Sequence, residues 1–175
     1  MPDHVETITR TARTALDDAD ILLVVGGASH GHRDFARMAL APLGLRLLFA
    51  GVSMRPGKPL WYGRIGKAHI LGLPGNPTAA MTTARLFLAP MVSAMAGADF
   101  DDALRWFDLP SKQMVETGGD RDHFLCGRRE DASVRIIARQ QASAQMMLAQ
   151  ADLLVERRAH AVAAQAGASL RCLKF

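Results

Sequence analysis

The first part of the chain alternates between helical and strand-like hydrophobic patterns. Apolar residues recur at helical spacing over residues 5–16, and an unbroken apolar run, ILLVV, occupies residues 21–25 just before Gly26. A short unbroken run beside a helix is typical of a parallel strand that is buried on both faces. The pattern then predicts a helix over 34–43, a strand over 45–54, two strands around a turn in 59–73, and a helix from 77 to Gly97.

The character of the sequence changes after Gly97. An acidic segment, ADFDDA, is followed by strand-like patterns over residues 104–110, 123–129, 133–139, 152–157 and 169–175. One short helical pattern over residues 142–151 interrupts them. We therefore expect an α/β domain over residues 1–97 and a small all-β, barrel-like domain over residues 98–175.

Charge favours a small anionic ligand over a polymer. The net charge is +4 and the pI is near 9.6, but the arginines are scattered and form no Lys/Arg run. Nucleic acid is therefore not expected as a partner, because its binding surfaces concentrate basic residues. A phosphorylated or other anionic small molecule accounts for the same mild excess.

Two features of the sequence bear on where the protein acts. Cys126 and Cys172 have neither metal-ligand spacing nor a disulfide framework, which suits a reducing, cytoplasmic compartment. The longest apolar stretch, residues 77–96, contains Arg85 and Pro90 and predicts a buried helix. We therefore expect no association with a membrane.

Three unusual loops follow predicted strands of the α/β domain. The first is GGASHGHRD at residues 26–34, whose glycines allow backbone N–H groups to approach a ligand and whose Asp34 adds a carboxylate. The second is MRPGKP at residues 54–59, in which two prolines restrain a turn that carries Arg55 and Lys58. Ligands of parallel α/β sheets bind beyond the carboxyl ends of the strands, so these loops are candidates for one site.

The third loop is LPGNP, at residues 73–77. Pro77 suits the first position of a helix, and Asn76 suits the N-cap before it. The free N–H groups at a helix start favour an anion. Together the loops offer backbone groups at Gly26, Gly27, Gly31, Pro74 and Gly75, a helix start, two cations and one carboxylate. This combination suits a phosphorylated ligand with a bound metal ion.

One segment of the first loop also permits a hydrolase. Residues 27–31 match the G-x-S-x-G nucleophile elbow, with Ser29 as nucleophile, and Asp108 is followed by His123 or His160 in the hydrolase order. The elbow requires a helix directly after the serine, and here a polar stretch intervenes. A serine hydrolase is therefore kept as an alternative function.

The same loop offers a possible transition-metal site. His30, His32 and Asp34 alternate, so a strand-like backbone places the three side chains on one side. A His-x-His pair in a loop is usually solvated, and the sequence offers no fourth ligand nearby.

With all three loops in view, the sequence resembles the molybdopterin molybdenumtransferase family (MoeA and the gephyrin E domain). The family pattern is Gly-Gly-x-Ser-x-Gly-x-x-Asp-[Phe/Tyr], then [Arg/Lys]-Pro-Gly-Lys-Pro, then Leu-Pro-Gly-Asn-Pro, and the chain carries these in the same order. The segment from Gln141 to Ser143, with Met146 and Leu148, resembles a Gln-x-Ser segment of the family's C-terminal β domain.

The resemblance implies a reaction and roles for individual residues. Family members take adenylylated molybdopterin and molybdate, release AMP, and leave molybdenum on the pterin dithiolene. Asp34 would hold Mg²⁺ or assist cleavage of the adenylate, while Arg55 and Lys58 would bind molybdate or phosphate. Ser29 would then contact the ligand, residues 74–77 would shape the pocket, and Ser143 would contribute from the second domain.

The chain also departs from the family pattern. It begins after the first strand-helix half of the family's molybdopterin-binding α/β domain, so an acidic Gly-Asp-Glu turn and a central strand are expected to be missing. Full-length relatives are expected to be homodimers through N-terminal domains. We therefore expect this chain to self-associate and to be incomplete for molybdenum insertion on its own. A non-catalytic molybdopterin-binding or scaffold module of the same fold is a further alternative.

Overall fold

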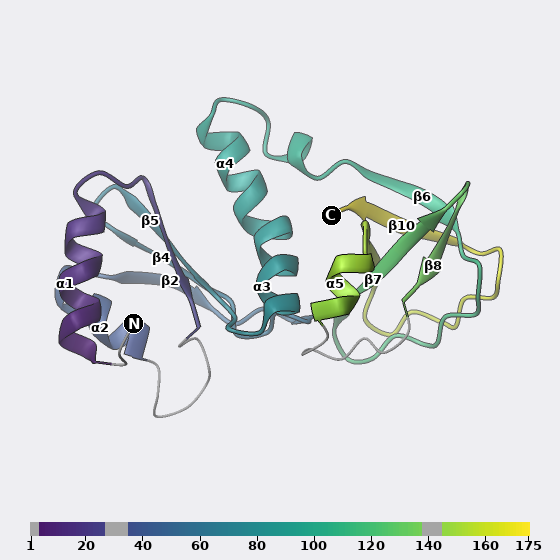
Figure 1. Ribbon diagram of the computed structural model, residues 1–175, viewed down its shortest axis with the longest axis horizontal. Helices are drawn as coiled ribbons and strands as arrows, with labels where there is room; N and C mark the ends of the chain where they lie inside the picture. The colour runs from purple at the N-terminus through teal and green to yellow at the C-terminus, as the bar shows by residue number, and fades with distance from the viewer. Residues whose placement is uncertain (1–3, 27–34, 138–144) are drawn as a thin grey trace. The chain divides into compact units, whose positions relative to one another are not determined.

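The computed structural model describes residues 4–26, 35–137 and 145–175, which form two compact units (Figure 1). The first unit comprises Met1–Val52 and Gly57–Asn76, and the second comprises Ser53–Pro56 and Pro77–Phe175. The chain therefore passes from one unit to the other three times. The helical segment 77–95 belongs to the second unit, where Arg85 Nε donates to the carbonyl of Lys174 at 2.8 Å. The boundary between these units differs from the domain boundary expected at residue 97. The domain boundary stays a prediction.

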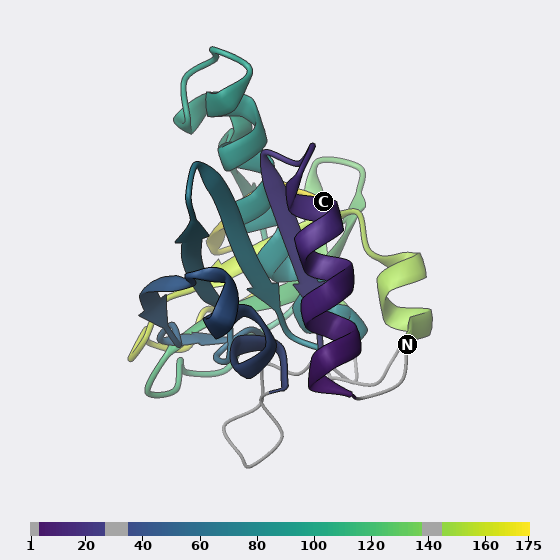
Figure 2. The same cartoon turned by 90° about the vertical axis from the view of Figure 1, so that its left-hand side faces the viewer.

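The first unit is a four-stranded mixed sheet with two helices on one face (Figures 1 and 2). The strands are β1 (Ile21–Val25), β5 (Ala68–Leu73), β4 (Trp61–Ile65) and β2 (Arg46–Ala50), in that spatial order. β1 runs parallel to β5, and the other neighbours are antiparallel. The helices are α1 (Val5–Leu16) and α2 (Phe35–Leu40), which is followed by a 3₁₀ turn, η1 (Ala41–Leu43).

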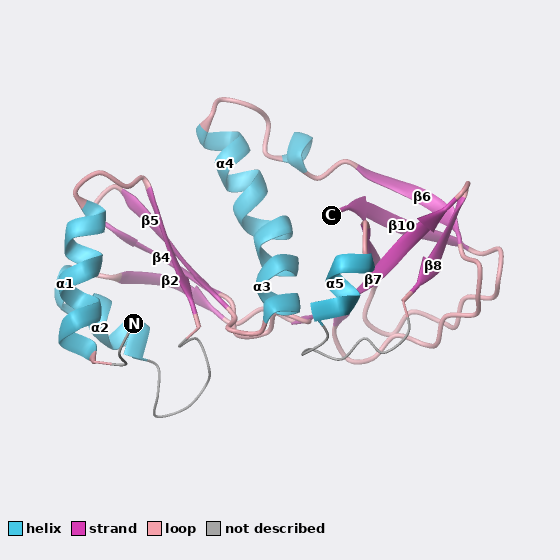
Figure 3. Cartoon of the chain, viewed as in Figure 1, coloured by secondary structure: helices cyan, strands magenta, loops and turns pink. Residues whose placement is uncertain are grey.

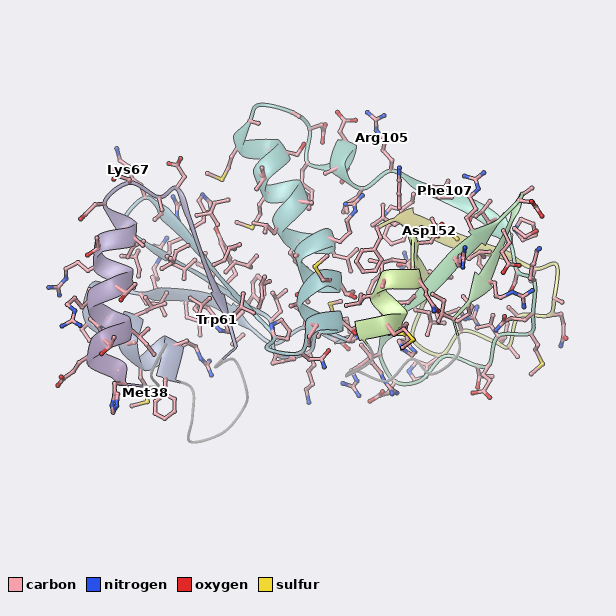
Figure 4. The ribbon with its side chains drawn as sticks, in the orientation of Figure 1. Met38, Trp61, Lys67, Arg105, Phe107 and Asp152 are labelled. Carbon is pink, nitrogen blue, oxygen red and sulfur yellow. The ribbon has the colours of Figure 1, made fainter. Side chains whose placement is uncertain are left out.

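The core of the first unit lies between this sheet and its helices. Alternate residues of β1, Leu22 and Val24, pack against the buried cluster, while Leu23 and Val25 remain exposed. Trp61 is the largest side chain of the cluster and is 1% exposed (Figure 4). Its indole occupies the space beside Gly72, because a Cβ on Gly72 would lie 1.9 Å from Trp61 Cε2.

The second unit is an antiparallel β structure that closes like a barrel (Figure 3). Its strands are β3 (Met54–Arg55), β7 (Asp122–Glu130), β9 (Leu153–Arg157), β10 (Ser169–Lys174) and β6 (Trp106–Pro110), in that order, and β8 (Ser133–Ile136) pairs with β7. Only β3 runs parallel to its neighbour, β7, within the described sheet. A bridge between Ser111 and Val134 joins the ends of the β6 and β8 segments, so the all-β, barrel-like prediction is confirmed.

The helical segment that begins at Pro77 has three parts. They are α3 (Pro77–Thr83), a π-helical turn, η2 (Ala84–Leu88), and α4 (Ala89–Met95). Pro90 has no N–H to donate and clashes with a regular helical turn before it, which accounts for the wider turn at this point. The segment ends at Gly97, whose φ of 87° suits glycine, as the sequence predicts. A 3₁₀ turn, η3 (Asp101–Ala103), follows, and the remaining helix is α5 (Gln145–Gln150).

The strand expected over residues 45–54 is wrong as a single element. β2 ends at Ala50 because Gly51 adopts a φ of 88°, and its N–H donates to the carbonyl of Leu60 at 2.8 Å. The next strand, β3, belongs to the second unit. The turn at Gly51 therefore lies inside a continuous run of apolar residues. Glycine makes its backbone conformation possible.

A membrane span is a separate question. Within the described ranges, no helix combines the length and the apolar character needed to cross a bilayer.

We predict that Gly72→Ala destabilises the first unit by about 1–3 kcal/mol, the usual cost of overpacking a core. The added methyl group has no space beside the Trp61 indole, so the side chain must move. Chemical denaturation followed by tryptophan fluorescence measures the change. Gly119→Ala is the matched control, since its Cβ would meet no atom within 4 Å; equal stability of both variants would contradict the packing account.

Candidate functional site

One edge of the first sheet gathers the ends of all four strands. β1 and β5 are parallel, with Val25 beside Leu73, so their carboxyl ends lie together. Trp61, at the start of β4, pairs with Gly72, and Ala50, at the end of β2, pairs with Trp61. The segments after β1, between β2 and β4, and after β5 therefore all leave the sheet at this edge, called here the loop edge.

Two backbones approach closely at the loop edge. Gly26 N–H donates to the carbonyl of Leu73 at 3.1 Å, which extends the pairing of β1 and β5 by one bond. A Cβ on Gly75 would lie 3.2 Å from the Cα of Gly26, tighter than most real contacts. Gly26 also has a φ of 86°, in the left-handed region. These glycines bring the first and third loops into contact through backbone alone.

Lys58 is held at the loop edge by backbone hydrogen bonds. Its carbonyl accepts from Val52 N–H at 3.0 Å, and Leu60 N–H donates to the Gly57 carbonyl at 3.0 Å. The Lys58 side chain is exposed, and no ion pair is recorded for it in the described part of the chain. A cation on a fixed backbone is therefore available to an anion.

The LPGNP segment lies where the sequence predicts a helix start. Pro74 is buried directly after β5, and Pro77 is the first residue of α3. Asn76 occupies the position before the helix, where an N-cap belongs. Pro77 is counted with the second unit, whereas Pro74, Gly75 and Asn76 belong to the first.

Several predicted site residues lie outside the described residues. They are Gly27, Ser29, Gly31, Asp34 and Ser143, together with His30 and His32. The metal role of Asp34, the nucleophile elbow and the His-x-His site therefore stay predictions. Across residues 4–26, 35–137 and 145–175, no three His, Cys, Asp or Glu side chains come together as a metal site.

Arg55 is anchored in the second unit. Its strand, β3, pairs in parallel with β7, which places Arg55 directly beside His123. Burial of the imidazole, and then the charge of Arg55, lower the pKa of His123 to about 4. His123 is therefore neutral at neutral pH. Sequence patterns do not predict this pairing of Arg55 with His123, because the two residues are far apart in the chain.

Asp108 and His123 do not form the acid–base pair that the hydrolase alternative requires. Asp108 lies on β6 and His123 on β7, and β9 and β10 separate these strands in the sheet. Asp108 pairs in register with Arg171 instead. His160 adopts a φ of 58° in a connecting segment.

The two thiols of the second unit have no nucleophilic character. Cys126 and Cys172 are free and buried. Burial raises the pKa of each thiol to about 11, and Asp108 adds to the effect at Cys172. Because the thiolate is the reactive form, these residues serve as core side chains.

We predict that His123 titrates near pH 4 and that Arg55→Met raises its pKa towards the ordinary value of 6.5. The substitution removes the positive charge that disfavours the imidazolium, while burial remains. NMR titration of the imidazole measures both values. Arg105→Gln removes a charge from the segment leading into β6 and should leave the titration unchanged (Figure 4).

The same shift sets a pH window for stability. Between about pH 4 and 6.5 the unfolded chain binds a proton that the folded His123 does not, so stability falls as the pH falls through this window. A His123→Gln variant should lose this part of the pH dependence. A wild-type pKa near 6.5 would contradict the burial of the imidazole.

Sequence comparison identifies relatives of the chain. The family model described as a probable molybdopterin binding domain matches residues 1–94. The molybdopterin molybdenumtransferase of Haemophilus influenzae is 31% identical over 97 residues, which is 55% of this chain and 24% of that protein. The enzyme of the same name from a Nostoc species is 30% identical over 128 residues, which is 71% of this chain and 29% of that protein. The chain thus spans about a quarter of the length of these curated relatives.

Solved structures agree on the fold. The molybdopterin biosynthesis MoeA protein of Pyrococcus horikoshii superposes with a TM-score of 0.82 at 24% identity, covering 99% of this chain and 41% of that one. A molybdenum cofactor biosynthesis protein of Pyrococcus furiosus gives a TM-score of 0.79 at 20% identity, covering 100% and 56%. The α/β unit followed by a β-rich unit is therefore a MoeA-like fold, and the chain belongs to the family of probable molybdopterin binding domains, as its resemblance to the molybdopterin molybdenumtransferases predicts.

Proposed function

We propose that this chain acts in molybdenum cofactor biosynthesis by binding adenylylated molybdopterin and molybdate at the loop edge of the first unit. The observation that carries the proposal is the departure of three loops from one sheet edge, with Gly26 and Gly75 in backbone contact. The family match over residues 1–94 supplies the ligand class. The reaction proposed is insertion of molybdate with release of AMP.

Each described residue has a role that its position supports. Lys58 offers an exposed ammonium group on a fixed turn, which suits a phosphate or molybdate oxygen. Gly26 and Gly75 are proposed as backbone contacts of the pterin or phosphate, at the point where the first and third loops meet. Gly27, Ser29 and Gly31 are proposed as ligand contacts in the first loop. In the second unit, Arg55 is proposed as an anion-binding cation and Ser143 as a ligand-binding residue.

Magnesium is proposed only through Asp34. The described segments of the loop edge, residues 51–60 and 74–76, contain no Asp or Glu. They supply cations and backbone donors, which suit anions, whereas Mg²⁺ prefers carboxylate oxygens.

We also propose that the chain self-associates through β1. In the described sheet β1 has β5 as its neighbour on one side, and Leu23 and Val25 are 40% and 63% exposed. An apolar strand without a charged residue at a sheet edge recruits another strand. Light scattering tests this; a monomer at high concentration would exclude it.

We predict that Lys58→Ala weakens binding of molybdate and of AMP by about 1–3 kcal/mol, the cost of losing one charge-assisted contact. Calorimetric titration measures both affinities. Lys67→Ala is the matched control, because Lys67 lies in the β4–β5 turn at the opposite end of the same sheet (Figure 4). Equal affinities for wild type and Lys58→Ala, or an equal loss in the control, would remove Lys58 from the site.

The reaction itself is tested by AMP release from adenylylated molybdopterin on addition of molybdate. Release that depends on Lys58 supports the enzyme. Binding without release favours the alternative, a non-catalytic molybdopterin-binding module. Labelling of Ser29 by a fluorophosphonate would instead indicate the serine hydrolase.

A further inference from the structure

We propose that Arg55, His123 and Arg157 of the second unit together bind a small tetrahedral dianion, such as inorganic phosphate, a phosphate monoester or molybdate. These residues are called here the cross-strand row. The inference rests on the proposed function in one respect, since Arg55 is already proposed to bind the anion. It adds two further binding residues: Arg157, which the sequence does not single out, and His123, which the sequence suggests only as a hydrolase histidine.

The three side chains lie in one row across three adjacent strands. Arg55 of β3 pairs with His123 of β7, and His123 pairs with Arg157 of β9. Residues directly opposite each other in a sheet share one face, with Cβ atoms about 4.5–5.5 Å apart. The row therefore places two arginines in register on either side of one histidine.

The row lies on the face of the sheet that carries the core. Leu125 and Val155, two residues away on β7 and β9, are 7% and 0% exposed and belong to the core cluster. Alternation along a strand puts His123 and Arg157 on the same face as these residues. His123 and Arg157 thus continue the inner face to the end of the strands, where they are partly buried, whereas Arg55 at the edge of the sheet is exposed. Partial burial strengthens the electrostatic interactions of the two inner residues.

The charges of the row are not balanced by a carboxylate among the described residues. The ion pairs recorded there join Glu130, Glu156, Asp120 or Asp131 to cations outside the row. Asp122 precedes His123 but points to the opposite face, and its Oδ1 accepts from Ala159 N–H at 2.8 Å. Neighbouring like charges destabilise a sheet, and a bound dianion would offset that cost.

Arg157 is oriented by the backbone and keeps one donor free. Its Nη2 donates to the carbonyls of Glu116 and Val162, at 3.1 and 2.5 Å. Its Nε is buried and has no hydrogen-bond partner among the described residues. A buried donor without a partner costs free energy, which an anion oxygen would recover. Because carbonyls already fix the guanidinium, little ordering is needed when the anion binds.

His123 is the third residue of the cross-strand row, and its pKa is a measure of anion binding there. The neutral imidazole offers one N–H donor to an anion oxygen. The charged groups in register with it are Arg55 on β3 and Arg157 on β9. The charge of Arg55 disfavours protonation of the imidazole. An anion bound beside His123 opposes this effect, so binding should raise the pKa of His123.

NMR titration of His123 with inorganic phosphate tests the site, with AMP and molybdate as separate arms. We expect the pKa of His123 to rise by about one unit or more at saturation, because an adjacent opposite charge has effects of this size. Arg157→Lys, which keeps the charge but loses Nε, should weaken phosphate binding about tenfold. His123→Leu removes the N–H donor, so it should also weaken phosphate binding in calorimetry, and it tests the row if Arg157→Lys does not fold. Arg105→Gln is the matched control for net charge.

The possible results separate this site from the proposed function. A His123 response that is unchanged in Lys58→Ala supports the row even where no AMP is released. Phosphate saturation without a His123 response overturns the row, even if Lys58-dependent AMP release is found. Wild-type phosphate affinity in folded Arg157→Lys or in folded His123→Leu overturns it as well.

Discussion

The parallel pairing of β1 with β5 is the constraint on which the loop edge depends. It aligns Val25 with Leu73, and the extra bond from Gly26 N–H to Leu73 holds the two strand ends together. Because β4 is antiparallel to β5, its first residue also reaches this edge. Loops that are about 30 and 50 residues apart in sequence therefore start from neighbouring points. Two glycines in contact keep the space between them free of side chains.

The MRPGKP segment contributes residues to both units, so its two cations, Arg55 and Lys58, are held by different parts of the structure. Arg55 is fixed by the pairing of β3 with β7, and Lys58 by hydrogen bonds of the β2–β4 connection. The chain changes unit between Pro56 and Gly57. A change in Arg55 therefore affects the electrostatics of the β-rich unit, whereas a change in Lys58 affects the α/β unit. This division makes the roles of the two cations separable by mutation.

Local sequence patterns predict several individual elements, whereas they do not predict which distant segments pair. ILLVV, the hairpin around Gly66 and the end of the helix at Gly97 were evident from periodicity and from turn residues. The break at Gly51 was missed, because the apolar run around it continues. The contact of Arg55 with His123 could not be predicted either, since strand register depends on packing between segments far apart in sequence. The roles of Asp34 and Ser143 stay predictions, since both lie outside the described residues.

Amide hydrogen exchange in the presence and absence of AMP tests most directly whether the three loops form one site. The account predicts that AMP slows exchange together at Gly26, in residues 57–60 and in residues 75–76 of the first unit, because one ligand contacts all three segments. Exchange in the β4–β5 turn, at the opposite end of the sheet, should not change. Slowing confined to one of the three segments, or found only away from the loop edge, would contradict the central claim.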